Sequence, residues 1–300
     1  MENYDLAWAA GFFDGEGWAA PRERGVAARI NQAGLDGMPE VLLKFRRIVG
    51  VGRLKGPINE EGKRPLYYWE VSSRTDVSSV AELLGPWLCP LKRAQFEGAL
   101  GAPPPASIWP GSLSEELAWA GGFFDGEGST YLDKHRTHSG YFDPVLHVTQ
   151  SAESGVAPEL SRLQAALGIG RISGVQRPKP PRKPYRRLRV YTPEKVQLAL
   201  HLLWPFIGAV KRTQARRVMQ VIHSQPDLPR GNPAFGVAGA RYCVRGHDKW
   251  NARVRPFKGR GKNEDDPGNH FRQCLTCVRE DARARRKRNR RLEPADSGVS

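Results

Sequence analysis

Four carboxylates stand in two copies of one short pattern, and their types and spacing could support chemistry. Asp14 and Glu16 lie near the end of LAWAAGFFDGEG, and Asp125 and Glu127 lie near the end of LAWAGGFFDGEG. Each copy reads as a short apolar helix with its acids at the C-terminal end, where the helix dipole disfavours negative charge. If the two helices lie side by side in parallel, their acids converge. A cation such as Mg²⁺ between them would relieve the repulsion.

Small residues on the same helices would allow close packing. Gly11 and Gly15 in the first copy, and Gly122 and Gly126 in the second, recur every four residues on one helical face. Glycine inside a helix costs about 1 kcal/mol relative to alanine, so two in each short helix need a reason. Two smooth stripes can pack backbone to backbone. The sequence therefore predicts a tight helix pair with glycines at its contact.

The duplication extends through most of the chain. The motif copies share eleven of twelve residues, and two further pairs of segments match in the same order, which indicates two homologous halves. The three matching pairs are 6–17 with 117–128, 50–54 with 168–172, and 86–95 with 205–214. We therefore divide the chain into half one (1–100), a linker (101–112), half two (113–223), a second linker (224–240), a small module (241–280) and a basic tail (281–300).

Each half is expected to have the element order αββαββα, which gives an α+β fold of two pseudo-symmetric halves. Ser112 and Glu115 form a candidate capping box before the second motif helix. Alternating or β-branched segments predict the strands, and apolar residues at helical spacing predict the helix between them. The strands are expected near 26–31, 67–71, 144–149 and 188–191, the middle helices near 41–49 and 160–167, and the closing helical stretches near 77–100 and 194–222.

The charge balance points to a polyanionic partner. Lys and Arg number 47 against 31 Asp and Glu, the formal net charge is +16, and the pI is near 10.0. The ten residues 282–291 hold seven positive charges and no acid, so the rest of the chain is basic as well. Nucleic acid is the first candidate partner and an acidic membrane surface the second.

Other classes of protein fit less well. The most apolar stretch, 196–210, is interrupted by Gln197, His201 and Pro205, so no membrane span is expected. The N-terminus MENYD does not resemble a secretory signal. Four cysteines in 300 residues do not make a disulfide framework. We expect an intracellular protein.

The segments AAGFFDGEG and AGGFFDGEG resemble the LAGLIDADG motif of the homing endonucleases, and two copies resemble the monomeric branch of that family. The resemblance covers about residues 1–222. It implies a saddle of antiparallel sheet on double-stranded DNA, with the motif helices at its centre. The acid in the eighth motif position would bind Mg²⁺ (or Mn²⁺). Here that acid is Glu16 and Glu127, whereas the family more often has Asp.

The resemblance also implies how the strands of DNA are cut. Divalent ions would bridge Glu16, Glu127 and the two scissile phosphates, and each half would hydrolyse one strand. Lys92 and Lys211 match basic residues that would stabilise charge on the phosphorus centre. Gln32 and Gln150 match polar residues that would position water. As simpler readings, the glutamates are solvated helix-end acids, the lysines are surface charges and the glutamines are ordinary polar residues.

Basic residues in the strands and loops are candidates for contact with DNA. A two-stranded ribbon fits the major groove, where Arg can pair bidentately with guanine, but most such residues touch phosphate. The halves differ most in these segments, so a recognition site that is not a perfect palindrome is expected. The candidates are Arg22, Arg24, Arg29, Arg53, Lys55, Lys134, Arg136, Arg171, Arg186, Arg187 and Arg189.

The small module carries a second candidate metal site. Cys243, His247, Cys274 and Cys277 form two short pairs, as in a closed tetrahedral Zn²⁺ site. The residues between the pairs are polar and Gly-rich, so such a piece would need metal to fold. The arrangement resembles small zinc modules appended to phage-type endonucleases. Buried or free thiols are the alternative.

Two other functions remain open on the sequence. The same fold could serve a DNA-binding regulator that no longer cuts, although both motif acids are present. It could also serve an RNA-binding intron maturase. A conventional zinc-finger regulator would explain only the last sixty residues or so.

Overall fold

The computed structural model describes most of half one and half two. The chain divides into two compact units, Met1–Ser224 and Gln225–Ser300. In the first unit the described residues are 3–34, 37–134, 142–152, 157–179, 181 and 183–224.

The second unit is described only in short stretches. It contributes one antiparallel pair, β9 (Arg253–Pro256) with β10 (His270–Gln273), and a few single positions up to residue 286. The expected zinc ligands Cys243, His247, Cys274 and Cys277 lie outside the described residues. No helix among the described residues is long and apolar enough to cross a membrane.

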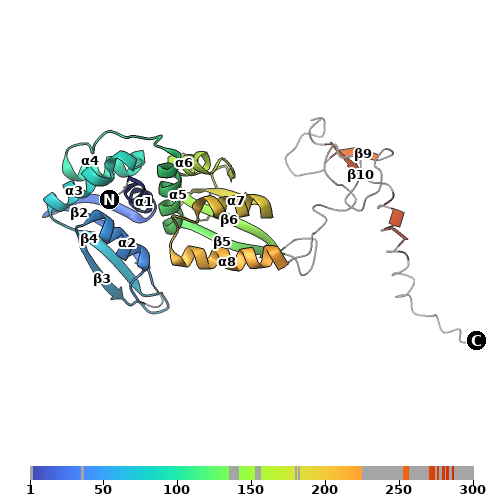
Figure 1. Ribbon diagram of the computed structural model, residues 1–300, viewed down its shortest axis with the longest axis horizontal. Helices are drawn as coiled ribbons and strands as arrows, with labels where there is room; N and C mark the ends of the chain where they lie inside the picture. The colour runs from blue at the N-terminus through green and yellow to red at the C-terminus, as the bar shows by residue number, and fades with distance from the viewer. Residues whose placement is uncertain are drawn as a thin grey trace, which may run out of the picture. The chain divides into compact units, whose positions relative to one another are not determined.

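The first unit has the expected α+β fold of two similar halves, which is confirmed (Figure 1). Each half contains one four-stranded antiparallel sheet, with strand order β1-β2-β4-β3 or β5-β6-β8-β7. Half one runs α1 (Asn3–Glu16), β1 (Gly17–Arg22), β2 (Gly25–Ala33), α2 (Glu40–Val49), β3 (Arg53–Ile58), β4 (Leu66–Val71), α3 (Arg74–Leu84), the 3-10 helix η1 (Gly85–Trp87) and α4 (Pro90–Leu100). Half two runs α5 (Leu113–Glu127), β5 (Gly128–Lys134), β6 (Phe142–Ser151), α6 (Pro158–Leu167), β7 (Arg171–Ile172), β8 (Tyr185–Tyr191), α7 (Pro193–Leu203) and α8 (Ala209–Ser224).

The closing stretch of each half differs from the single helix that the sequence predicts. It forms two helices, α3 and α4 in half one and α7 and α8 in half two. Pro90 takes the first position of α4, where a missing amide proton costs nothing. In half two Pro205 stands between α7 and α8, because its ring cannot continue a helix interior. The break lets α4 and α8 change direction and return toward the sheets.

Each sheet buries one face and exposes the other. In β4 burial alternates, with Tyr67, Trp69 and Val71 buried and the residues between them partly exposed. In α2 the apolar side chains lie at helical spacing and pack on the same core. Phe45 of α2 meets Trp69 edge to face, with 4.9 Å between the ring centroids. The partly exposed face of each sheet is therefore free to hold polar groups.

Helices α1 and α5 lie side by side at the centre of the unit, one from each half (Figure 1). A Cβ atom added at Gly11 would lie 2.0 Å from the carbonyl oxygen of Trp119, and one at Gly122 would lie 1.9 Å from that of Trp8. These distances leave no room for a side chain. The backbones therefore approach as closely as the two glycine stripes allow, and Ser112 and Glu115 form the capping box at the start of α5.

The two halves also form polar contacts with each other beside this helix pair. Arg162 of α6 is buried, forms an ion pair with Glu116 at 2.9 Å, and donates to the carbonyl oxygen of Trp87 in half one. Lys44 of α2 donates to the carbonyl oxygen of Phe206 in half two at 3.3 Å. In the alignment of the two halves Lys44 corresponds to Arg162, and Phe206 corresponds to Trp87. Each half therefore contacts the turn that precedes the last helix of the other half.

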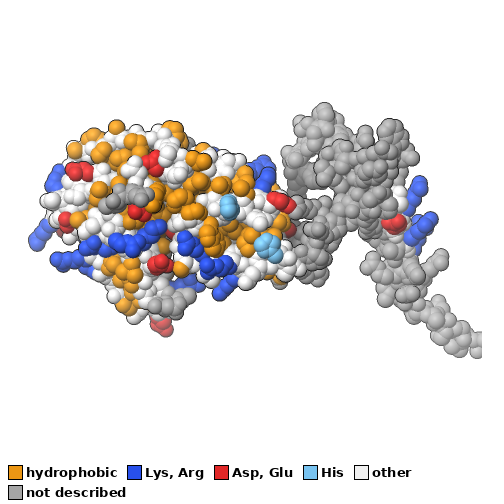
Figure 2. Space-filling view, viewed as in Figure 1, with side chains coloured by type: hydrophobic (Ala, Val, Ile, Leu, Met, Phe, Trp, Pro, Cys, Tyr) orange, Lys and Arg blue, Asp and Glu red, His pale blue; other side chains and the backbone are white. Residues whose placement is uncertain are grey.

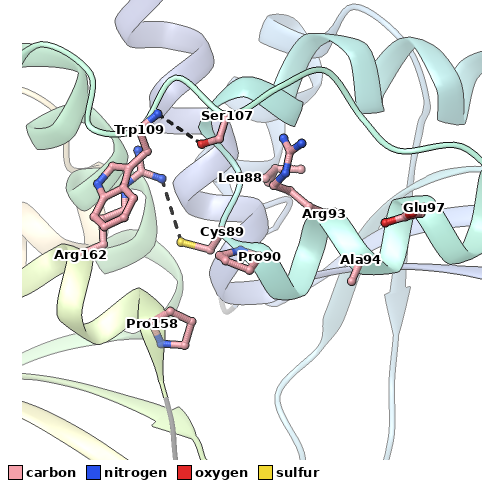
Figure 3. Close-up of a pocket in the computed structure, with 10 residues that line it drawn as sticks. All are labelled: Leu88, Cys89, Pro90, Arg93, Ala94, Glu97, Ser107, Trp109, Pro158 and Arg162. Atoms are coloured by element: carbon pink, nitrogen blue, oxygen red, sulfur yellow. Dashed lines mark hydrogen bonds between the residues drawn. The ribbon is translucent and has the colours of Figure 1, made fainter.

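A cavity of about 440 Å³ lies where α4, the linker and α6 meet. Figure 3 shows Trp109 of the linker beside Arg162, whose guanidinium points toward the Cys89 sulfur 4.0 Å away. Most of the other lining side chains are apolar or belong to α4. Neither motif glutamate lines the cavity, so it is distinct from the site described next.

Candidate active site and nucleic-acid face

Glu16 and Glu127 end α1 and α5, and the glycine contact brings them together. A Cβ atom on Gly15 would lie 3.2 Å from Cγ of Glu127, and one on Gly126 would lie 3.0 Å from Cγ of Glu16. Each glutamate stem therefore lies against the other helix, just past the last glycine. The two half-buried carboxylates from different halves occupy one end of the helix pair.

The protein environment disfavours charge on both glutamates. Burial raises the pKa of Glu127 to about 7, and the neighbouring charge of Glu16 adds to the effect. Burial also raises the pKa of Glu16, while Lys211 and Lys92 act against the rise. The positive charge near these two half-buried acids is therefore too small to offset the effects of burial and of their mutual repulsion on the pKa values. An added cation at this end of the pair would stabilise both.

Lys92 and Lys211 occupy matching places in the two halves. Each is the third residue of its helix, α4 or α8. Lys92 donates to the carbonyl oxygen of Gly17, and Lys211 donates to that of Gly128 at 2.6 Å. These glycines follow the two motif glutamates directly. Burial lowers the pKa of both lysines, and nearby carboxylates including Glu16 and Glu127 oppose the fall.

The two glutamines occupy equivalent positions but make different hydrogen bonds. Gln32 donates from its side-chain nitrogen to Glu16 at 3.0 Å. Gln150, at the equivalent position of β6, accepts through its side-chain oxygen from the backbone N–H of Ser151 at 3.3 Å. The structure therefore joins Gln32 to the glutamate of its own half, and Gln150 has a different described bond. The two halves of the site are not identical.

Asp14 and Asp125 do not converge with the glutamates, which differs from the interpretation of the four acids as one cluster. Asp14 is buried and accepts from Trp119 Nε1 of the other half at 2.8 Å and from the Cys89 N–H at 3.0 Å. Asp125 accepts from Trp8 Nε1 at 3.1 Å and from the Gly208 N–H at 2.8 Å. Burial raises their pKa values to about 7 and about 6.

These aspartates have a positioning role that sequence reasoning missed. Cys89 is the residue before α4, and Gly208 is the residue before α8. Each aspartate therefore ties the helix pair to the first turn of the helix that carries a site lysine. The helical period could have predicted that Asp14 is buried. Asp14 is three residues from Gly11 and therefore shares the buried face of α1, whereas Glu16 is five residues away and does not.

The exposed face of each sheet carries a row of mostly polar side chains next to the glutamates. The register pairs Trp18, Arg29, Glu70 and Arg53 across half one. The corresponding row in half two is Ser129, His147, Arg189 and Arg171. The partly exposed alternate positions of β2, β4, β6 and β8 form these rows. We call the two exposed surfaces the half-one face and the half-two face.

Most of the expected DNA-contacting residues lie on or beside these faces. Arg29 stacks over the ring of Tyr68, 3.7 Å from its centroid, and Arg187 donates to Thr149 at 3.1 Å. Arg22 ends β1, Arg24 lies in the following turn, and Lys55 lies in β3. Arg186 shares its side of β8 with the buried Leu188 and Val190, so it lies on the opposite face from Arg187 and Arg189.

Two of the expected residues are not described at side-chain level. Arg136 lies outside the described residues, and only the backbone of Lys134, the last residue of β5, is described. On the surface seen in Figure 2, Lys and Arg side chains gather in a band across the unit, and fewer acids accompany them. The basic charge of the sequence is thus concentrated on part of this surface.

Comparison with known proteins finds similarity at the level of structure. No family and no curated protein matches the sequence. The solved structure of the LAGLIDADG homing endonuclease I-GzeII with its DNA target aligns over 73% of this chain and 89% of that one, at 15% identity and a TM-score of 0.53. The LAGLIDADG meganuclease I-AabMI bound to uncleaved DNA aligns over 74% and 91%, at 17% identity and a TM-score of 0.50. The chain therefore has the two-half fold of the LAGLIDADG homing endonucleases.

Proposed function

We propose that the protein is a site-specific double-strand DNA endonuclease of the homing type, acting as a monomer inside cells. The observation that carries the proposal is the meeting of Glu16 and Glu127 at the end of the glycine-lined helix pair. The similar solved structures are DNA endonucleases of this fold. Each half supplies one carboxylate, one lysine and one sheet face, which suits a substrate of two strands.

The residues at this point fit a divalent cation such as Mg²⁺ or Mn²⁺. Mg²⁺ is usually bound by one or two carboxylates and takes its remaining ligands from substrate phosphate and water. Among the described residues no group of three or more His, Cys, Asp or Glu could hold a metal. Glu16 and Glu127 are two carboxylates with raised pKa values, so a site completed by DNA phosphates suits them. When bound, the ion would supply charge stabilisation and a more acidic water.

The other residues of the site would orient the reacting groups. Lys92 and Lys211, held by the carbonyl oxygens after the glutamates, would place positive charge beside each scissile phosphate. Gln32 holds the Glu16 carboxylate in one orientation. Gln150 would need to rotate from its contact with Ser151 to do the same for Glu127. We therefore expect the two strands to be cut at different rates.

Cleavage of a randomised duplex DNA library in Mg²⁺ tests the proposal. The wild type should yield one enriched double-strand cut site, and Glu16→Gln and Glu127→Gln should each abolish cutting or reduce it to nicking. Glu82→Gln is a matched control, because Glu82 is an exposed glutamate on α3 away from the site. This control should cut as the wild type does.

The same library separates the alternatives. A wild type that selects one duplex sequence but never cuts, even with Mn²⁺, would instead be a DNA-binding regulator. Strong binding to the RNA of a host intron, measured separately, would support the maturase.

We also propose a zinc site formed by Cys243, His247, Cys274 and Cys277. The residue types and their two short pairs support it. Metal analysis of the purified chain should find one Zn²⁺ per molecule, and Cys274→Ser with Cys277→Ser should remove it. An unchanged metal content in that variant would refute the site.

A further inference from the structure

The half-one and half-two faces carry opposite charges at one equivalent position. Each sheet begins just after a motif glutamate, and the register pairs Gly17 with Ile30, and Gly128 with Val148. Counting along the paired strands from these points makes Glu70 of β4 the counterpart of Arg189 of β8. The centre of the row is thus acidic in half one and basic in half two.

Glu70 is held firmly by two cations on its own face. It accepts from Arg22 at 2.9 Å and from Lys55 at 3.1 Å, with one carboxylate oxygen for each. The Glu70 side chain is 12% exposed, whereas those of Arg22 and Lys55 are 45% and 46% exposed. Burial raises the pKa of Glu70, but Lys55 and Arg22 hold it below the ordinary value, so the carboxylate stays charged at neutral pH.

Arg189 in half two is held far less. Its nearest acid, Asp133 of β5, is 3.9 Å away, and its Nε has no hydrogen-bond partner among the described residues. Arg171 and Arg187 lie beside it on β7 and β8. The half-two face therefore has at its centre the guanidinium group of Arg189, which is held by fewer partners than Glu70 is in half one.

A carboxylate in the middle of a surface that meets DNA lowers affinity, because it repels phosphate. It also restricts the cations beside it. Freely moving Lys and Arg side chains suit phosphates, which carry no sequence information. Cations fixed in position suit base edges in the major groove, where geometry distinguishes the bases. A partly buried acid that holds two exposed cations therefore lowers affinity and raises discrimination between bases.

We propose that Glu70 is a specificity-determining residue, which fixes Arg22 and Lys55 to read base edges in the half-site bound by half one. The inference rests on the proposed function, because it requires the two faces to bind duplex DNA. Arg189, at the equivalent place, contributes directly to binding in half two. The charge difference makes the two half-sites unlike each other in sequence.

The test compares Glu70→Gln with Glu60→Gln in the full-length chain. Glu60 is an exposed acid of the same half whose described partner is Lys63, so the control removes the same charge away from the row. Binding without Mg²⁺ is measured in two ways: affinity for a random-sequence duplex across a salt series, and base preference by sequencing the bound fraction of a randomised duplex library.

Glu70→Gln should bind the random duplex several-fold more tightly, with the log–log salt slope steeper by about 1–2, because Arg22 and Lys55 become free to contact phosphate. Base preference should fall about tenfold at positions in one half-site and stay unchanged in the other. Arg189→Gln should instead weaken binding and alter the other half-site. Glu60→Gln should leave base preference unchanged in both half-sites.

Unchanged preferences in Glu70→Gln, with an affinity gain equal to that of Glu60→Gln, would overturn the inference and reduce Glu70 to a net-charge effect. If Glu70→Gln does not fold, the double variant Arg22→Met with Lys55→Met is measured in its place. That variant should lose the same half-site preference, and retention of the preference would overturn the inference. A wild type with no preference in either half-site would instead refute the proposed function.

Discussion

Gly11 is the position where one added methyl group should have the largest effect on stability. In Gly11→Ala the new Cβ would lie 2.0 Å from the Trp119 carbonyl oxygen and 2.8 Å from its carbon. Both are backbone atoms of α5, so no side-chain rotation relieves the clash. An ordinary contact begins near 3.4 Å, and the helices would therefore have to separate by about 1.4 Å.

The cost follows from what this separation disturbs. Overpacking of a filled core costs about 1–3 kcal/mol. The bond from Trp119 to Asp14, at 2.8 Å, crosses the same gap, and a hydrogen bond to a charged group contributes about 1.5–3 kcal/mol. The better helix propensity of alanine returns about 1 kcal/mol. We expect a net loss of about 3 kcal/mol in the free energy of unfolding, or about 6–12 °C in Tm for a unit of this size.

Urea denaturation followed by tryptophan fluorescence measures this loss, because Trp8 and Trp119 are buried at the helix pair. Gly98→Ala is the matched control. Gly98 lies in α4, and a Cβ atom there would meet nothing within 4 Å, so this change should stabilise by about 0.5–1 kcal/mol. If Gly11→Ala is as stable as the wild type while the control behaves as expected, the backbone contact between the helices is not as close as described.

Four further expectations concern single groups. Trp119→Phe should cost about 2 kcal/mol in urea denaturation, since buried Asp14 loses a donor; an unchanged midpoint would contradict this role. Ser112→Ala should cost about 1 kcal/mol, because the α5 capping box loses its side-chain acceptor, and a thermal melt would detect it. Burial, with Arg187, Arg189 and Lys211, lowers the pKa of His147 to about 4, so the contribution of His147 to stability should fall as pH falls from about 6.5 to about 4, and over that range the free energy of unfolding of the wild type should fall relative to that of His147→Gln. EDTA should abolish cleavage but leave duplex binding measurable by fluorescence anisotropy; cutting that persists in EDTA would exclude a divalent ion.

Much of the fold could be predicted because the chain contains its pattern twice. The duplication predicted the two halves, the alternating segment at 67–71 predicted a strand, and the glycines predicted the contact of α1 with α5. The break between α3 and α4 was less visible, because residues 77–100 are apolar enough for one long helix. Its cause is the local chemistry of Pro86 and Pro90, which end one helix and begin the next.

The candidate site was only partly visible in the sequence. Motif position marks Glu16 and Glu127, and the matched segments mark Lys92 and Lys211. The helical period indicates that Asp14 is buried, but its role depends on a tryptophan 105 residues away, which no local pattern indicates. The different contacts of Gln32 and Gln150 depend on side-chain rotamers, and identical residue types at equivalent positions conceal the difference.

The reciprocal contacts between the halves also have a consequence for how the chain is made. Half one leaves the ribosome first, before Trp119 can donate to Asp14 and with the α1 stripe still uncovered. At about 5–20 residues per second, the 111 residues that separate the two motifs take roughly 6–22 s to synthesise. During that interval Trp8 and Phe12, which are buried in the complete unit, lack their contacts with α5. We therefore expect half one to bind a ribosome-associated chaperone until the second motif emerges.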